Sequence, residues 1–167
     1  RSASEATLNH APTIAAIGDA GVFITRLAER AGDRARRPEW VATLRERDAL
    51  RETSIDAQAA PPGAPASGDA YVNPVAFFRA LERAAGDNAV FVADGGDFVA
   101  TSSYILHPRA PLTWLDPGVF GTLGVGAGFA AGAALARPGS EVWLLWGDGA
   151  SGYGLAEFDT FVRHGIP

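Results

Sequence analysis

An aspartate between two glycines, directly after an apolar run, is the feature of this chain best suited to chemistry. Residues 141–146 read Glu-Val-Trp-Leu-Leu-Trp, and Gly147-Asp148-Gly149-Ala150-Ser151 follow at once. Glycines let a phosphate approach backbone amides, and one carboxylate can hold a Mg2+ ion that bridges two phosphate oxygens. Asp148 is therefore a candidate metal ligand. A second interpretation stays open, in which Asp148 only caps the helix that follows.

A second apolar run ends in the same way. Residues 88–93 predict a strand, and Asp94-Gly95-Gly96-Asp97 come after it. Ligands of open parallel sheets bind beyond the carboxyl ends of the strands, so both glycine tips are expected near one site. The acid pairs Asp94/Asp97 and Glu157/Asp159 are interpreted as helix caps and solvated faces rather than as acid–base pairs.

Strands and helices alternate along the chain with short connections. This order predicts an α/β fold with a mostly parallel sheet and helices on both faces. The predicted strands are residues 12–17, 88–93, 112–115 and 141–146. The predicted helices are residues 20–31, 40–51, 74–85, 98–105, 124–135 and 155–164. Residues 57–68, rich in Pro, Ala and Gly, are typical of a linker.

Composition narrows the class of protein. The chain has 167 residues, 47% of them apolar, and a net charge of −5, which argues against binding nucleic acid. It contains no cysteine, which excludes disulfides and zinc–thiolate sites. It starts with Arg1 and has no methionine, so it is expected to be part of a longer polypeptide. No signal peptide or membrane span is evident, and a cytoplasmic location is expected.

A glycine-rich segment offers an alternative function. Gly126-Ala127-Gly128-Phe129-Ala130-Ala131 matches the G-x-G-x-x-A fingerprint of nicotinamide dinucleotide sites. However, it follows a glycine-rich turn rather than a strand. Gly124, Gly128 and Gly132 also recur every four residues, which predicts a smooth helix face packed close to a sheet. An NAD-binding oxidoreductase domain remains the alternative from another class of enzyme.

The Gly147–Ser151 segment, with residues 155–160 and 163–167 behind it, resembles the motif of thiamine-diphosphate-dependent enzymes. That motif is Gly-Asp-Gly followed further along by an Asn pair. The resemblance implies that Gly147, Asp148, Gly149, Ala150 and Ser151 bind the cofactor, and that Asp148 binds the Mg2+ that anchors its diphosphate. The second metal ligand, an Asn, is expected beyond Pro167.

Upstream residues carry the same resemblance. Residues 116–126 (Asp-Pro-Gly-Val-Phe-Gly-Thr-Leu-Gly-Val-Gly) are similar to the segment that holds the cofactor's aminopyrimidine. The likeness implies that the Gly121 carbonyl accepts from the 4′-amino group, with Thr122 beside it. It also implies that Leu123 wedges between the two rings and forces a V shape. Gly95-Gly96-Asp97 match a loop that touches the diphosphate.

The resemblance also assigns parts of the chain to domains. Residues 1–32 look like the end of a central domain, residues 33–68 like a helix and linker, and residues 69–167 like the first half of a C-terminal domain that binds thiamine diphosphate and Mg2+. In this family a glutamate from the N-terminal domain of a neighbouring subunit protonates the pyrimidine. No residue here takes that catalytic role. A homodimer or homotetramer with its active site between subunits is expected.

Within the family, Leu115-Asp116-Pro117-Gly118 and Phe129-Ala130 look most like 2-hydroxyacyl-CoA lyases and oxalyl-CoA decarboxylases. The implied reaction cleaves or forms the C1–C2 bond of a 2-hydroxyacyl-CoA, with formyl-CoA and an aldehyde or ketone as the other side of the reaction. The partners implied are an acyl-CoA and the remaining segments of the polypeptide. An acetolactate-synthase-like carboligase or decarboxylase of 2-oxo acids, and a catalytically inactive subunit that keeps the fold, are the alternatives.

Overall fold

The described residues of the first compact unit form short and long helices without a buried core. The computed structural model describes residues 4–32, 37–59 and 72–167, and the chain divides into the units Arg1–Asp48 and Ala49–Pro167. In the first unit, the short 3-10 helix η1 (Glu5–Thr7) precedes α1 (Ala20–Ala31) and the start of α2 (Pro38–Ala59). None of its described residues is buried.

The strand predicted at residues 12–17 is wrong, because this segment forms bends and irregular backbone. A strand needs a hydrogen-bonded neighbour, and the described residues of this unit contain none. The predicted helix at residues 20–31 is confirmed. The Asp19 side chain caps it by accepting a hydrogen bond of 2.9 Å from the Val22 amide.

The second unit is built on a parallel sheet in the order β2-β1-β3. Its strands are β1 (Ala89–Asp94), β2 (Trp114–Leu115) and β3 (Glu141–Trp146), and Phe91 of β1 is aligned with Trp114 and Trp143. Every residue of β1 is buried, as expected for the central strand of a parallel sheet. The strand predicted at residues 112–115 is shorter than expected, because Leu112 has a φ of 62° and cannot be extended.

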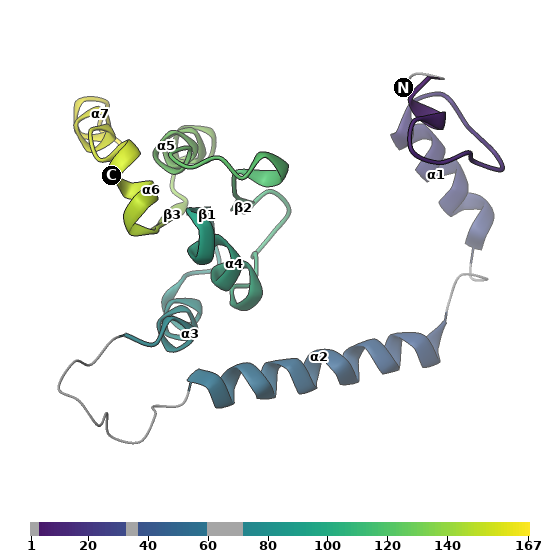
Figure 1. Ribbon diagram of the computed structural model, residues 1–167, viewed down its shortest axis with the longest axis horizontal. Helices are drawn as coiled ribbons and strands as arrows, with labels where there is room; N and C mark the ends of the chain where they lie inside the picture. Colours follow the sequence, from purple (N-terminus) through teal and green to yellow (C-terminus); the bar gives the residue numbers. More distant parts are fainter. Residues whose placement is uncertain (1–3, 33–36, 60–71) are drawn as a thin grey trace. The chain divides into compact units, whose positions relative to one another are not determined.

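Helices cover both faces of this sheet, as predicted (Figure 1). On one face α3 (Pro74–Ala84) and α4 (Gly96–Ile105) bury Phe78 and Ile105 against Phe91. On the other face α5 (Gly126–Ala136) packs against β1 and β3. The chain then continues into α6 (Asp148–Gly154), which was not predicted, and α7 (Glu157–Arg163), which corresponds to the helix predicted at residues 155–164.

The glycine face predicted for α5 does not pack on this sheet. The buried residues of α5 are Gly126, Ala127, Ala130 and Ala133. A Cβ added at Gly128 or Gly132 would meet no atom within 4 Å. Alanines therefore make the close contact, since they occupy the helix positions that face the sheet.

Two arginines fasten α3 to its neighbours. Arg79 donates to the Glu52 carboxylate at 2.6 Å and lies 3.0 Å from the Asp56 carboxylate, so it joins α3 to the last turns of α2. Arg109 pairs with Glu82 at 2.6 Å and donates to backbone carbonyls at the end of α3. A cation in this position complements the helix dipole.

The structure also bears on the helix predicted at residues 40–51 and on the linker predicted at residues 57–68. The helix predicted at residues 40–51 extends over the whole of α2, and residues 57–59 of the predicted linker are its last turn. Residues 60–68 of that linker lie outside the described residues. No helix in the described part of the chain combines the length and the apolar character needed to cross a membrane.

The Arg79–Glu52 pair predicts an acid dependence of stability. The hydrogen bond from Arg79 lowers the pKa of Glu52 from its ordinary value of 4.5. The stabilisation is therefore complete above pH 4.5 and is lost as the pH falls through the lowered pKa. Because the Glu52 side chain is 34% exposed, we expect Glu52→Gln to lower the free energy of unfolding at pH 7 by about 1 kcal/mol or less.

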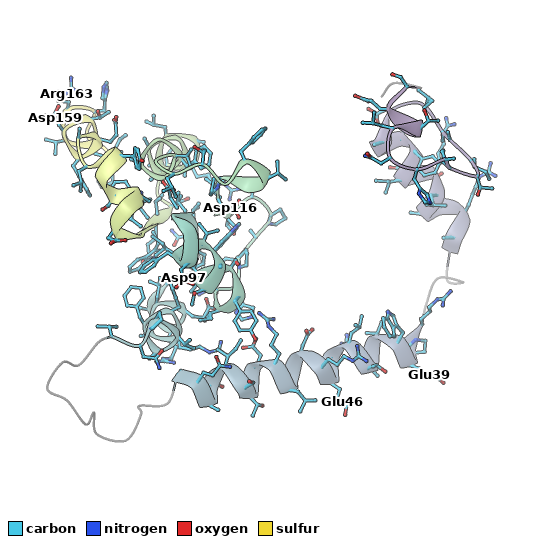
Figure 2. All side chains as sticks on the ribbon, viewed as in Figure 1. Glu39, Glu46, Asp97, Asp116, Asp159 and Arg163 are labelled. Atoms are coloured by element: carbon cyan, nitrogen blue, oxygen red, sulfur yellow. The ribbon has the colours of Figure 1, made fainter. Side chains whose placement is uncertain are left out.

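Denaturant titrations at pH 7 and at pH 3 or below test this expectation. The difference between Glu52→Gln and the unmodified protein should shrink in acid. Glu46→Gln, a matched change at an exposed glutamate of α2 (Figure 2), should change stability little at either pH. A Glu52→Gln effect that stays constant with pH would contradict the assignment.

Candidate cofactor site

Two adjoining hollows lie where the strands of the sheet end. The first has a volume of about 260 Å3 and the second about 460 Å3, and Gly96 and Leu123 line both. Figure 2 labels one acidic residue of each hollow, Asp97 in the first and Asp116 in the second. A ligand with two parts could therefore occupy both hollows around Leu123.

The first hollow is lined mainly by the two glycine tips predicted from the sequence. Its lining residues are Gly95, Gly96, Asp97, Phe98, Leu123, Gly147, Asp148, Gly149 and Ala150. The two tips touch each other: a Cβ on Gly95 would lie 2.9 Å from the Ala150 Cβ, and the φ of Gly95 is 104°. A residue with a side chain at position 95 would push the tips apart.

Backbone amides at the start of α4 make this hollow suitable for an anion. The helix α4 begins at Gly96, and the amides of its first turn have no acceptor within the helix. The amides of Phe98 and Val99 donate to the Gly95 carbonyl, which bends the chain from β1 into the helix, so the amides of Gly96 and Asp97 are the ones left for a ligand. The N-terminal end of α4 also carries a partial positive charge that favours phosphate.

The Asp148 side chain is exposed and free to bind a cation. The helix α6 begins at Asp148, its N-cap residue is Gly147, and no side chain caps it. The interpretation of Asp148 as a helix cap is therefore wrong. Ser151 donates its hydroxyl to the Asp148 backbone carbonyl at 2.7 Å rather than to the carboxylate.

The donor set fits Mg2+ better than a transition metal. In the described part of the chain, no group of three or more His, Cys, Asp or Glu side chains could hold a metal ion. Mg2+ commonly takes one or two carboxylates and completes its shell with phosphate oxygens and water. Asp148, with Asp97 on the same hollow, suits an ion that arrives with a phosphorylated ligand.

Asp116 shapes the second hollow. Its carboxylate accepts from the Trp114 indole at 2.8 Å and from the Gly118 amide at 2.7 Å. These bonds set the start of η3 (Gly118–Phe120), after which Gly121 takes a left-handed conformation with a φ of 56°. Gly121 and Leu123, which the resemblance assigned to the cofactor, line this hollow, whereas Thr122 and Ser151, assigned to it in the same way, line neither hollow.

Asp94, which the sequence suggested to be a cap or a solvated acid, is a buried anchor. It is 0% exposed. Its carboxylate accepts from the Gly126 amide at 2.7 Å and from the Gly124 amide at 3.0 Å. Its carbonyl accepts from the Gly147 amide at 3.2 Å.

Asp94 therefore contacts all three segments that line the hollows, since the first glycine tip also follows it directly in the chain. The sequence does contain a signal for this role. Asp94 ends a strand whose other residues are all apolar, so its side chain had no route to water. Asp159, by contrast, is exposed and pairs with Arg163 at 2.7 Å, as predicted for a solvated face (Figure 2).

The dinucleotide fingerprint is not supported by the backbone. Gly126 is the first residue of α5, and the element before it is η3 rather than a strand. The strand-to-helix turn that would place a pyrophosphate on these glycines is therefore missing. The fold is instead a parallel α/β domain with two hollows beyond its strand ends, whose lining suits a phosphorylated cofactor.

Comparison with known proteins specifies the family. Residues 94–167 match the family "Thiamine pyrophosphate enzyme, C-terminal TPP binding domain", thiamine pyrophosphate being another name for thiamine diphosphate. The chain belongs to the thiamine-diphosphate-dependent enzymes, which confirms the resemblance found in the sequence. The matched region contains both glycine tips, Asp94 and Leu123.

Curated relatives point to one branch of this family. The chain is 51% identical over 156 residues to 2-hydroxyacyl-CoA lyase 2 of Homo sapiens, covering 93% of this chain and 24% of that protein. It is 49% identical over 129 residues to 2-hydroxyacyl-CoA lyase 2 of Caenorhabditis elegans, covering 77% of this chain and 20% of that protein. A probable acetolactate synthase of Mycobacterium bovis is 41% identical over 95 residues, 57% of this chain and 17% of that protein. The chain thus spans about a quarter of the length of its lyase relatives, as expected for a piece of a longer polypeptide.

The surroundings of Gly124 predict that a larger residue at this position destabilises the protein. Its φ is 92°, and an added Cβ would lie 2.7 Å from the Tyr153 Cβ. We expect Gly124→Ala to lower the free energy of unfolding by about 2 kcal/mol or more, because backbone strain and overpacking act together. Denaturant unfolding measures this loss.

Gly128→Ala is the matched control. Gly128 lies inside α5 with no atom within 4 Å of the added Cβ, so alanine should stabilise the helix by up to about 1 kcal/mol. Equal effects of the two substitutions would show that the close approach of Gly124 to α6 does not matter for stability.

Proposed function

We propose that the protein containing this chain is a thiamine-diphosphate- and Mg2+-dependent lyase that cleaves or forms the C1–C2 bond of a 2-hydroxyacyl-CoA, with formyl-CoA and an aldehyde or ketone on the other side of the reaction. The observation that carries this proposal is the identity with proteins named 2-hydroxyacyl-CoA lyase 2 over 93% of the chain. The paired hollows around Leu123 support the cofactor assignment independently.

The residues of the first hollow would hold the charged end of the cofactor. Asp148 would bind Mg2+, and the ion would in turn bind the diphosphate. The free amides at the start of α4 would donate to the phosphate oxygens, and the glycines would allow the close approach that these bonds need. Asp97 lines the same hollow and would face the ion rather than the phosphates, since like charges repel.

The residues of the second hollow would orient the rings. The Gly121 carbonyl would accept from the aminopyrimidine, and Leu123, 42% exposed at the junction of the hollows, would separate the two rings. When bound, thiamine diphosphate supplies a carbon nucleophile and an electron sink. The task of this chain is to bind the cofactor and fix its shape.

A decarboxylase or carboligase of 2-oxo acids is the runner-up, because the Mycobacterium bovis protein named as a probable acetolactate synthase matches 57% of the chain. The wider identity with the lyases favours the acyl-CoA substrate. Homo-oligomeric assembly with the site between subunits and a cytoplasmic location stay predictions from the sequence.

Asp148 provides the test of the metal site. In the intact protein, Asp148→Ala should weaken Mg2+-dependent binding of thiamine diphosphate about tenfold or more, because a charged ligand is lost. Asp148→Asn keeps one oxygen donor and should have a smaller effect. Isothermal titration calorimetry with thiamine diphosphate plus Mg2+, with thiamine diphosphate plus EDTA and with NAD measures these differences.

The exposed Asp159→Asn serves as the control and should bind like the unmodified protein. Binding of NAD, or unchanged cofactor affinity in Asp148→Ala, would count against the proposed site.

Substrate choice is tested with the intact protein loaded with cofactor. We expect turnover of a 2-hydroxyacyl-CoA, followed as release of formyl-CoA, and little turnover of pyruvate. Comparable kcat/KM values for pyruvate would favour the acetolactate-synthase alternative. The loss of all activity in Leu123→Ala with cofactor still bound would indicate that the side chain shapes the rings rather than anchors them.

A further inference from the structure

The carboxylate of Asp94 lies behind the site rather than in it. Asp94 lines neither hollow and is fully buried, so it cannot touch a ligand bound there. Its bonds nevertheless go to the two glycines that follow the wedge residue Leu123. The Gly124 amide lies 3.0 Å and the Gly126 amide 2.7 Å from the same carboxylate oxygen.

The backbone between these two bonds has little freedom. Gly124 has a φ of 92°, and the position of its absent Cβ is 2.7 Å from the Tyr153 Cβ. Gly126 is confined in the same way, because a Cβ there would lie 2.5 Å from the Trp146 indole nitrogen and 2.8 Å from the Asp94 Cβ. The segment is therefore pressed between the sheet and α6 with its amides directed at Asp94.

We infer that Asp94 is a positioning residue: its carboxylate fixes Gly124 and Gly126, and through them Leu123, relative to the diphosphate tip. The bend that Leu123 imposes on the cofactor is then set before the cofactor binds. This inference rests on the proposed function of the two hollows. It adds a residue that acts through others, with no contact to the cofactor itself.

The two kinds of bond made by Asp94 allow this role to be isolated. The carbonyl that accepts from Gly147, and so holds the diphosphate tip, belongs to the backbone and survives substitution. Only the side chain holds the Leu123 segment. Substitution should therefore disturb the contacts to the rings while sparing the contacts to the diphosphate.

The experiment compares two ligands on the intact protein, thiamine diphosphate and inorganic pyrophosphate, each with Mg2+. We expect Asp94→Ala to weaken the binding of thiamine diphosphate about tenfold or more, because two buried amides lose their acceptor. Asp94→Asn keeps one oxygen acceptor, so its affinity should lie between those of Asp94→Ala and the unmodified protein. Pyrophosphate affinity should stay within about twofold in both variants, since a backbone carbonyl sets the tip that it binds.

Parallel losses for the two ligands would overturn the inference, because they would show a general structural role. Unchanged thiamine diphosphate affinity in both variants would overturn it too. Failure of the unmodified protein to bind thiamine diphosphate would instead refute the proposed function, so the two failures are distinguishable. Asp87→Asn, an exposed change in the turn before β1, is the matched control and should leave both affinities unchanged.

Amide hydrogen exchange is a second test, and it needs no ligand. It compares the unmodified protein with Asp94→Asn, so it does not depend on the folding of Asp94→Ala. Without cofactor, the amides of Gly124 and Gly126 should already be protected in the unmodified protein. In Asp94→Asn their exchange should accelerate while β3 stays protected. Unprotected amides in the unmodified protein would overturn the inference, because Leu123 would then not be fixed before binding.

Discussion

The buried carboxylate of Asp94 is the interaction on which the geometry of the site depends. A carboxylate removed from water is costly unless hydrogen bonds replace its hydration. Here the amides of Gly124 and Gly126 replace it, and both come from the segment that carries Leu123. Asp94 ends the central strand, so the same two hydrogen bonds do two things. They satisfy a carboxylate buried in the core, and they position the segment that carries Leu123.

Glycines make this arrangement possible at positions where their role is steric. At Gly95 and Gly124, a side chain would collide with a neighbouring segment and the backbone has a positive φ. The two tips and the Leu123 segment can therefore approach one another closely enough to leave narrow hollows. Binding energy is used most efficiently when the receptor is ordered beforehand, since less entropy is lost on binding. A site made of rigid glycine turns tied to a buried strand meets that condition.

The sequence predicted those parts of the structure that depend on local patterns. Residues 141–146 form the predicted strand, and Asp148 follows it with its carboxylate free. Predictions that depended on distant neighbours were wrong. The sequence of residues 12–17 favours a strand, but the described part of their unit offers no strand to pair with. On α5, the face with Gly128 points away from the sheet. Asp94 was missed as an anchor because its partners lie thirty and more residues further along the chain.

The cofactor and the substrate are supported by separate kinds of observation. The cofactor assignment rests on the family match over residues 94–167, and the geometry agrees with it, since the tips, the carboxylate of Asp148 and Leu123 together suit a bent diphosphate ester. The proposed substrate rests on the extent of identity, which covers 93% of the chain for a lyase and 57% for an acetolactate synthase. Members of one family that share a fold and a cofactor are expected to share the groups that anchor it, whatever reaction they catalyse. The contacts around Asp94 and Asp148 therefore bear on the cofactor alone, and the choice between an acyl-CoA and a 2-oxo acid depends on side chains that face the substrate.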